Sequence, residues 1–258
     1  MLFAIDSGNT NVVFAVFSDD GEIAHSWRIE TVSSTTVASF KHDIIAQLNK
    51  ANIVADDISD AIIATVVPDN LKDLIELCRV CFAIIPLVVG EDGVDLGLDV
   101  LVDHPSEVGA DRLVNAVAAG QLYQKPLVCV DFGTATTFDV IDKYGNYAGG
   151  AIAPGINLSL QALYSHAAKL PRIDVTPPPK VIGTNTIAAM QSGIYWGYVA
   201  MIEGMVERIH REYGKPLCVI ATGGLSPLFS KAIPMIQNTN VDLTMRGLYI
   251  IYKRNRSS

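Results

Sequence analysis

The feature that most constrains the fold of this chain is a short pattern that occurs twice. Ile5–Thr10 reads Ile-Asp-Ser-Gly-Asn-Thr and Val130–Ala135 reads Val-Asp-Phe-Gly-Thr-Ala, so an Asp-x-Gly turn separates two apolar runs in each place. Further along each half, Ile62–Thr65 is matched by Val219–Thr222. Such internal similarity indicates a duplicated unit. We therefore predict two similar domains, which 258 residues accommodate at roughly 100–150 residues each.

Predicted strands alternate with predicted helices in both halves. The first half predicts strands over 2–7, 12–17, 23–29 and 61–67, a hairpin turn at 19–21, and helices over 36–49 (capped at 33–35) and from Pro68. The second half predicts strands over 127–131, 137–142 and 147–152, after an irregular stretch at 94–104 and a helix near 107–122. This order favours an α/β fold with partly parallel sheets. We divide it into domains 1–115 and 116–258.

Composition excludes several classes of function. Lysine and arginine number 19 against 27 Asp and Glu, so the net charge of −8 repels polyanions and no nucleic-acid partner is expected. The sequence shows neither a basic leader nor an apolar run of ~18–20 residues, which predicts a cytoplasmic protein with no membrane partner. Cys78 and Cys81 form a C-x-x-C in a helical-looking segment without a second half of a zinc site, so we interpret them as an apolar helix face.

Two glycine turns have the composition of a phosphate-binding loop. Glycine lets backbone amides approach an anion, and hydroxyl or amide side chains add donors. Asp6–Asn11 holds all of these, although an ordinary hairpin turn has a similar composition. Asp131–Thr137 supplies a second, hydroxyl-rich turn, and Thr222-Gly223-Gly224 follows a strand where a nucleotide could lie against backbone. The Walker lysine motif and G-x-G-x-x-G do not occur, which excludes P-loop and Rossmann sites by motif.

A carboxylate and a guanidinium are adjacent in Glu107–Arg112, at the expected start of a helix. A carboxylate such as Asp111 can act as the base on a hydroxyl, and Arg112 suits a carboxylate or phosphate of a substrate. The alternative is an exposed ion pair in which Asp111 complements the helix dipole. The spacing by itself favours that alternative.

Taken together, these segments resemble the type III pantothenate kinases of the acetate and sugar kinase, Hsp70 and actin superfamily, and the resemblance covers nearly the whole chain. The motifs that carry it are Asp6–Asn11, Pro105–Arg112, Asp131–Thr137, Gly149–Gly155 and Ala221–Gly224. The resemblance implies a kinase that phosphorylates pantothenate with ATP, the first step of coenzyme A biosynthesis. It also implies two duplicated actin-like (ribonuclease H-like) domains with an interdomain cleft, in a homodimer.

The resemblance also assigns roles by matching position. The ATP phosphates would be held by Asp6, Ser7, Gly8, Asn9, Thr10, Asn11, Val12 and Val13, with a further ATP contact from Thr134. Asp6 would also lie near the divalent metal, Mg²⁺, and Asp131 would bind a monovalent cation, K⁺ or NH₄⁺. Asp111 would be the general base, and pantothenate would be contacted by Gly109, Ala110, Asp111, Arg112 and Thr186.

One position departs from the pattern of that family. Val102 stands three residues before Pro105, where a tyrosine is common, which puts one substrate contact in doubt. Two alternatives remain: a related phosphotransferase with another acceptor, and a non-catalytic regulatory protein on the same fold. The joint presence of the base and both turn aspartates argues against the second alternative, because a protein without turnover has no chemical need of them.

A long helix is predicted from 184–186 to about Gly214. Its apolar residues recur at three- and four-residue spacing, and with Tyr195 and Trp196 they cover more than one face. Such a helix is either buried within its own domain or part of a subunit contact. In the resembled family the matching helix forms the subunit contact, and the threonine matching Thr186 reaches pantothenate bound mainly by the partner chain. We therefore expect a homodimer in which each site depends on both chains.

Overall fold

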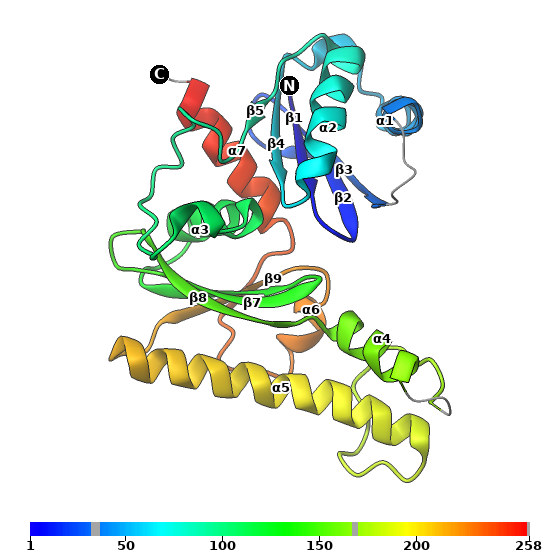
Figure 1. Ribbon diagram of the computed structural model, residues 1–258, viewed down its shortest axis with the longest axis vertical. Helices are drawn as coiled ribbons and strands as arrows, with labels where there is room; N and C mark the ends of the chain where they lie inside the picture. Colours follow the sequence, from blue (N-terminus) through cyan, green and yellow to red (C-terminus); the bar gives the residue numbers. More distant parts are fainter. Residues whose placement is uncertain (32–36, 167–169, 257–258) are drawn as a thin grey trace. The chain divides into compact units, whose positions relative to one another are not determined.

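The computed structural model describes residues 1–31, 37–166 and 170–256, which form two compact units (Figure 1). The first unit holds residues 1–121 together with the chain from Leu243 onward, and the second holds residues 122–242. The predicted boundary after residue 115 differs from this division into units in two ways. The second unit begins six residues later than expected, and the last helix belongs to the first unit, where it packs on the sheet. The cleft expected between the domains stays a prediction.

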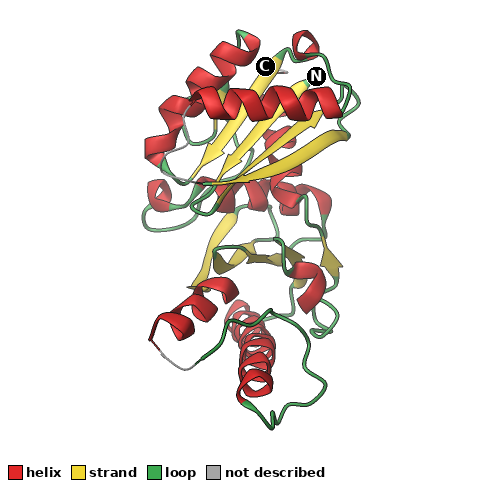
Figure 2. Ribbon diagram, turned by 90° about the vertical axis from the view of Figure 1, so that its right-hand side faces the viewer, coloured by secondary structure: helices red, strands yellow, loops and turns green. Residues whose placement is uncertain are grey.

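The first unit is a five-stranded sheet with helices on both faces (Figure 2). Its strands are β1 (Leu2–Ser7), β2 (Asn11–Phe17), β3 (Ile23–Glu30), β4 (Asp60–Thr65) and β5 (Leu87–Val88), in the order β3-β2-β1-β4-β5. Its α-helices are α1 (Val37–Lys50), α2 (Pro68–Phe82), α3 (Ala110–Leu122) and α7 (Leu243–Arg256), with short 3-10 turns at Ala55–Asp57 and Pro105–Glu107. The predicted cap at 33–35 lies outside the described residues.

The second unit repeats this sheet. Its strands are β6 (Leu127–Phe132), β7 (Ala135–Ile141), β8 (Tyr147–Pro154), β9 (Cys218–Thr222) and β10 (Asn238–Thr239), in the order β8-β7-β6-β9-β10. In both sheets the first three strands are antiparallel and the last two pair in parallel. Its helices are α4 (Ile156–His166), α5 (Thr186–Tyr213) and α6 (Ser226–Phe229). The duplication inferred from the repeated pattern is therefore confirmed in the strand order.

Strand alternation decides what each face of the first sheet buries, because successive side chains point to opposite sides. Phe3, Ile5 and Phe14 pack on one side against α1 and α2. Leu2 and Ala4 pack on the other side against α3 and α7. The C-x-x-C lies on α2 as expected: both thiols are free, and burial raises the pKa of Cys78 to about 12. A thiol held neutral in this way packs as a small apolar side chain.

In the second unit, α5 runs along one face of the sheet (Figure 1). Val130 and Phe138 from the strands meet Ile194 and Ile202 from this helix in a buried cluster. The Asn185 side chain accepts a hydrogen bond from the Ala188 amide at the start of α5, and Gly214 ends the helix in the left-handed conformation, φ 84°. The predicted helix is confirmed with both of its ends. Within the described part of the chain, no helix is both long and apolar enough to span a membrane, and the cytoplasmic location stays a prediction.

Candidate active site

The first predicted phosphate loop is a tight turn between β1 and β2. The Gly8 amide donates to the Asn11 carbonyl at 2.9 Å and so closes the turn. Thr31 holds it from the side, because its amide donates to the Thr10 carbonyl (2.8 Å) and its hydroxyl to the Gly8 carbonyl (2.9 Å). Asn9 and Thr10 are exposed at the tip. These hydrogen bonds fix the conformation of the loop and leave its polar tip exposed to solvent.

Asp111 lies in the first turn of α3 and is half-buried rather than fully exposed. One of its carboxylate oxygens, Oδ1, accepts a hydrogen bond from the Arg112 amide at 2.8 Å. A Cβ atom placed on Gly109 would stand 2.7 Å from this same oxygen, which is closer than real contacts allow. Glycine at 109 thus makes the room that the Asp111 carboxylate occupies.

The end of β4 brings the loop and the start of α3 together within the first unit. The Val66 amide donates to the Ser7 carbonyl at 3.0 Å, and the Val66 side chain lies 3.4 Å from where a Cβ on Gly109 would stand. Asp6 shares a sheet face with Ala4, the face that α3 covers. The two carboxylates predicted from the sequence, Asp6 and Asp111, therefore belong to the same side of the first unit.

In the second unit, two glycines press against the turn after β6. Gly223 has φ 85°, and a Cβ there would lie 2.5 Å from Asp131 Oδ1 and 2.7 Å from the Phe132 carbonyl oxygen. A Cβ on Gly155 would lie 2.1 Å from the Thr134 carbonyl oxygen. Neither position admits a side chain without displacing the turn. The backbone of these two glycines therefore lies directly against Asp131 and Thr134.

Asp131 is also the centre of a row of oxygen-bearing side chains across three strands. Thr137 of β7 pairs directly with it on one side and Thr222 of β9 on the other. Directly paired residues share a sheet face, with Cβ atoms roughly 4.5–5.5 Å apart. The opposite face of the same strands carries the apolar core against α5, so this row lies on the other side of the sheet.

Two residues further along β7, Asp139 is fully buried on the same face as this row. Its carboxylate accepts hydrogen bonds from the hydroxyls of Thr137 and Tyr147, each at 2.9 Å. Cys129, which pairs with Asp139, has its thiol pKa raised well above the usual range by burial and by the charges of Asp139 and Asp131. Both carboxylates therefore lie close to one thiol.

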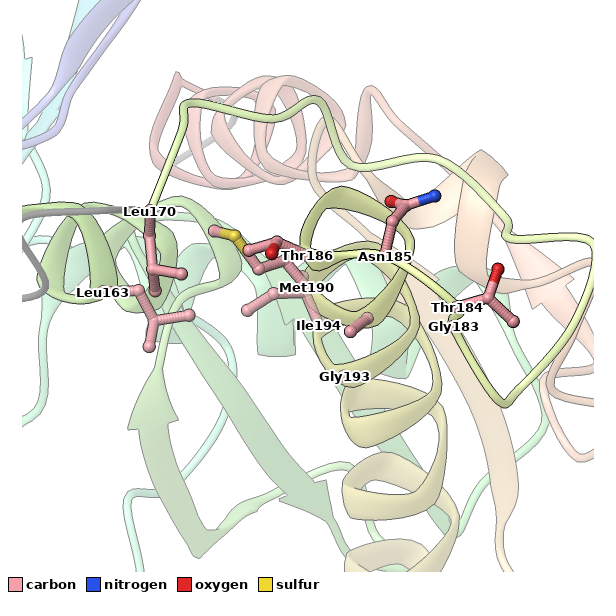
Figure 3. A pocket seen from close by; sticks show the side chains of 10 residues that line it. Leu163, Leu170, Gly183, Thr184, Asn185, Thr186, Met190, Gly193 and Ile194 are labelled. Atoms are coloured by element: carbon pink, nitrogen blue, oxygen red, sulfur yellow. The ribbon is translucent and has the colours of Figure 1, made fainter.

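Thr186 lines a different part of the second unit. It begins α5 and opens onto a hollow of about 730 Å³ (Figure 3). The lining is largely apolar or small, and its residues are Leu163, Leu170, Gly183, Thr184, Asn185, Thr186, Ala189, Met190, Gly193 and Ile194. In Figure 3 the Thr186 hydroxyl stands beside Met190, across from the two leucines. None of the other residues predicted for the site contributes to this lining.

The structure thus gathers the predicted residues into three places. The loop 6–13 and Gly109–Arg112 converge in the first unit, Asp131 and Thr134 lie together in the second, and Thr186 lines its own hollow. Sequence reasoning missed Thr222 and Asp139 as members of the polar row. The available signal was the period of two that places Thr137 and Asp139 on one side of a strand, but the partner strands were needed to align them with Asp131.

Comparison with known proteins identifies the family. A family model described as type III pantothenate kinase matches residues 2–208. A type III pantothenate kinase from Paramagnetospirillum magneticum is 56% identical over 255 residues, covering 99% of this chain and 98% of the relative. The chain belongs to the type III pantothenate kinase family. Its duplicated sheets are the actin-like domains that the resemblance implied.

Solved structures with this fold are much less similar in sequence. A protein described as a Baf family transcriptional activator, from Campylobacter jejuni, has a TM-score of 0.63 at 18% identity, covering 99% of this chain and 100% of its own. An activator of 2-hydroxyisocaproyl-CoA dehydratase from Clostridium difficile, solved with bound ADPNP, has a TM-score of 0.57 at 10% identity, covering 99% and 96%. At these identities the likeness establishes the fold alone.

Proposed function

We propose that this member of the type III pantothenate kinase family transfers the γ-phosphoryl group of ATP to pantothenate and forms 4'-phosphopantothenate, the first step of coenzyme A biosynthesis. The observation that carries the proposal is the family membership along nearly the whole chain, with 56% identity to a type III pantothenate kinase. Phosphoryl transfer needs mainly positioning and neutralisation of charge. The two Asp-x-Gly turns and the Asp111 segment are suited to these tasks.

The loop from Asp6 to Val13 is assigned to the ATP phosphates. Its exposed tip offers backbone amides and the side chains of Asn9 and Thr10, which are the donors that anions take at such turns. Mg²⁺ keeps several waters and is commonly held by one or two carboxylates plus substrate phosphates. Asp6, near the end of β1, would supply one such carboxylate. When bound, Mg²⁺ would neutralise charge on the phosphates.

Asp111 is assigned as the general base on the pantothenate hydroxyl. Its half-buried carboxylate has a position fixed by the Arg112 amide and by the space at Gly109. A base must reach the proton that it abstracts, and such fixing keeps the reactive oxygen in one place. The Arg112 guanidinium suits the pantothenate carboxylate. Ala110 begins the same helix and would contact the substrate from there.

A monovalent cation, K⁺ or NH₄⁺, is assigned to Asp131. The chemistry of the donors fits such an ion, because a carboxylate with threonine hydroxyls on both sides is an all-oxygen set. Gly223 adds to the fit, because a Cβ atom there would fill the space beside Asp131 Oδ1. When bound, the cation would offset negative charge on the nucleotide. Thr134, on the same turn, is assigned to ATP.

A homodimer is proposed through α5. Ala189, Gly193, Gly197 and Ala200 recur along this helix at three- and four-residue spacing, and all four are exposed. A Cβ on Gly193 or Gly197 would meet no atom of the described residues outside this helix within 4 Å, so packing among these residues does not itself require glycine at these positions. Small residues on an exposed helix face allow the close approach of a second helix. Thr186, at the start of the same helix, would then contribute to the pantothenate site of the partner.

An assay of pantothenate-dependent ADP release tests the proposal. With ATP, Mg²⁺ and pantothenate, ADP should form well above the rate without pantothenate in KCl or NH₄Cl, and more slowly in NaCl at equal ionic strength. Acetate, glucose and polyphosphate serve as competing acceptors. Faster release with one of these would identify a related phosphotransferase, and the absence of any acceptor-dependent release would contradict kinase function.

The cation assignment has its own variant. Asp131→Ala should remove the stimulation by potassium or ammonium and raise the KM for ATP, because the oxygen donor is lost. A wild-type enzyme that is equally fast in sodium alone would contradict the cation role while leaving the kinase assignment intact.

A further inference from the structure

A buried carboxylate near the proposed cation site has no role in the reaction described so far. Asp139 lies on β7 with no exposed surface, and burying a charge is costly unless it is hydrogen-bonded. The hydroxyls of Thr137 and Tyr147 donate to its two oxygens at 2.9 Å each. Both hydroxyls thus direct their hydrogens at this carboxylate, and each takes a different oxygen.

The direction of the hydrogen bond from Thr137 has a consequence for that residue. A threonine hydroxyl carries one hydrogen and two lone pairs. Because the hydrogen is donated to Asp139 Oδ2, the oxygen of Thr137 presents lone pairs to everything else around it. Thr137 is thereby fixed as an acceptor rather than a donor.

This acceptor stands beside Asp131. Thr137 and Asp131 are directly paired across β6 and β7, and Thr222 is paired with Asp131 from β9. Thr137 is 9% exposed and Thr222 is 1% exposed, so their side chains sit in a largely water-free place. In such a place electrostatic interactions are stronger than in water. A cation is stabilised there by oxygen lone pairs and repelled by hydroxyl hydrogens.

We infer that Asp139 is a positioning residue for the monovalent cation: it holds the Thr137 hydroxyl with its lone pairs available, so that Thr137 and Asp131 together face the ion with oxygen. The inference rests on the proposed function, since it deepens the assignment of K⁺ or NH₄⁺ to Asp131. Tyr147 supports the carboxylate from its other oxygen and does not belong to the row beside Asp131.

The probe is KCl itself, titrated against choline chloride at constant ionic strength, with the thermal unfolding midpoint as the readout. Binding to the folded state raises this midpoint with ligand concentration. Thr137→Val removes the oxygen at nearly constant shape, and we expect the K⁺ concentration for half of the effect to rise about tenfold, as for the loss of one ligand contact of ordinary strength. Thr137→Ser keeps a hydroxyl and should stay within about threefold of wild type, on the same reasoning.

Asp139→Asn tests the positioning step directly. The amide nitrogen cannot accept, so one of the two hydroxyls loses its acceptor. We expect K⁺ to bind more weakly than in the wild type. In saturating KCl, we expect this variant to have the same unfolding midpoint as Thr137→Val. The KM for ATP should rise in low KCl and recover in high KCl, which a purely structural defect would not do.

Thr136→Val is the matched control. Thr136 is the neighbouring threonine of the same strand and lies on the other face, and its buried hydroxyl has no hydrogen-bond partner among the described residues. This variant should keep the wild-type K⁺ midpoint. If Thr137→Val and Asp139→Asn keep it as well while Asp131→Ala abolishes the K⁺ effect, the positioning role is wrong. If K⁺ does not stabilise even the wild type, both the cation site and this role are wrong, and parallel ADP-release assays show whether pantothenate phosphorylation still stands.

Discussion

The two sheets have the same strand order but differ in what surrounds the equivalent aspartate. In the first unit, Asp6 pairs with Val13 and Ala64. In the second unit, the residues at the matching places beside Asp131 are Thr137 and Thr222. The duplicated backbone thus carries an apolar row in one copy and a hydroxyl row in the other.

The difference extends one step further along the strand. By register, Ala15 in the first sheet occupies the place that Asp139 occupies in the second. Ala15 belongs to the apolar cluster under α3 and α7, whereas the Asp139 carboxylate accepts hydrogen bonds from two hydroxyls. The two units therefore share the strand order that positions the aspartate, and they differ in a few side chains on one sheet face that determine which groups surround it. In the proposed mechanism the first unit supplies the base, and the second supplies the oxygen donors for a cation.

The largest expected effect concerns the base in the first unit. Asp111→Asn keeps size and hydrogen bonding but cannot accept the proton, so kcat should fall by ~10²–10⁴ while ATP affinity changes little. Steady-state ADP release gives kcat, and a fluorescent ATP analogue gives affinity. Glu107→Gln, at an exposed carboxylate of the same segment, is the control. A variant at Asp111 that retained more than half of the wild-type rate would refute the assignment.

Next in size is the expected restoration of activity in mixed dimers. Asp111→Asn damages the first unit of one chain and Thr186→Val the second unit of another, so a mixed dimer should contain one site with both lesions and one intact site. Random mixing makes half of the dimers mixed, which predicts about a quarter of the wild-type activity. Each variant alone is the control. Light scattering that showed a fully active monomer of 27.7 kDa would rule out the shared site.

A third comparison sets Gly223, which packs against the turn of the second unit, against Gly8, which lies within the turn of the first. Gly223→Ala forces a Cβ atom to within 2.5 Å of Asp131 and imposes φ 85° on a residue that avoids it. We expect a loss of roughly 1–3 kcal/mol in the free energy of unfolding. Gly8→Ala meets its nearest atom, the Asn11 carbonyl oxygen, at 3.2 Å, and should cost less. Urea denaturation of both variants tests the order, and an equal loss at the two positions would contradict it.

The effect that is smallest at neutral pH concerns the buried thiol of the first unit, and it grows only at alkaline pH. The pKa of Cys78 is raised by burial to about 12 in the folded chain, against 9.0 for the ordinary thiol. Above pH 9 the unfolded chain loses this proton and the folded chain keeps it, so the stabilisation is present in full below pH 9 and is lost toward pH 12. The slope approaches about 1.4 kcal/mol per pH unit. Cys78→Ala should flatten it between pH 9 and 10.5, measured by urea denaturation, whereas an unchanged slope would show that other groups dominate.

Much of the fold was predictable because its signals are local. The repeated Asp-x-Gly pattern gave the duplication, and the strands over 2–7 and 127–131 were found to within a residue or two. Helix α7 was not predicted, and the predicted domain 116–258 includes it, whereas its apolar residues pack within the first unit. Its apolar residues Met245, Leu248 and Ile251 have helical spacing, but nothing in that spacing says that they pack on Leu2 and Ala4 at the other end of the chain.

The site shows the same division between local and non-local information. Gly109 and Asp111 are close in sequence, and the segment that contains them could be recognised from its own residues. The row of Asp131 with Thr137 and Thr222 depends on the register between three strands, of which only two are joined by a short turn. Asp139 looked like an ordinary polar residue of a strand, because its burial becomes evident only when the sheet is assembled.

The return of the chain to the first sheet has a consequence for synthesis on the ribosome. One face of β1 and β4 is covered by α7, which is translated after the whole of the second unit. Domains usually fold in the order in which they emerge. Here the second unit, contiguous over residues 122–242, is complete first, and the part of the first sheet that α7 covers stays exposed until the segment from Leu243 leaves the exit tunnel. A stalled ribosome that holds only the segment from Leu243 onward inside its exit tunnel would therefore display one finished unit and one unit whose apolar sheet face lacks α7, which is a surface that chaperones and proteases recognise.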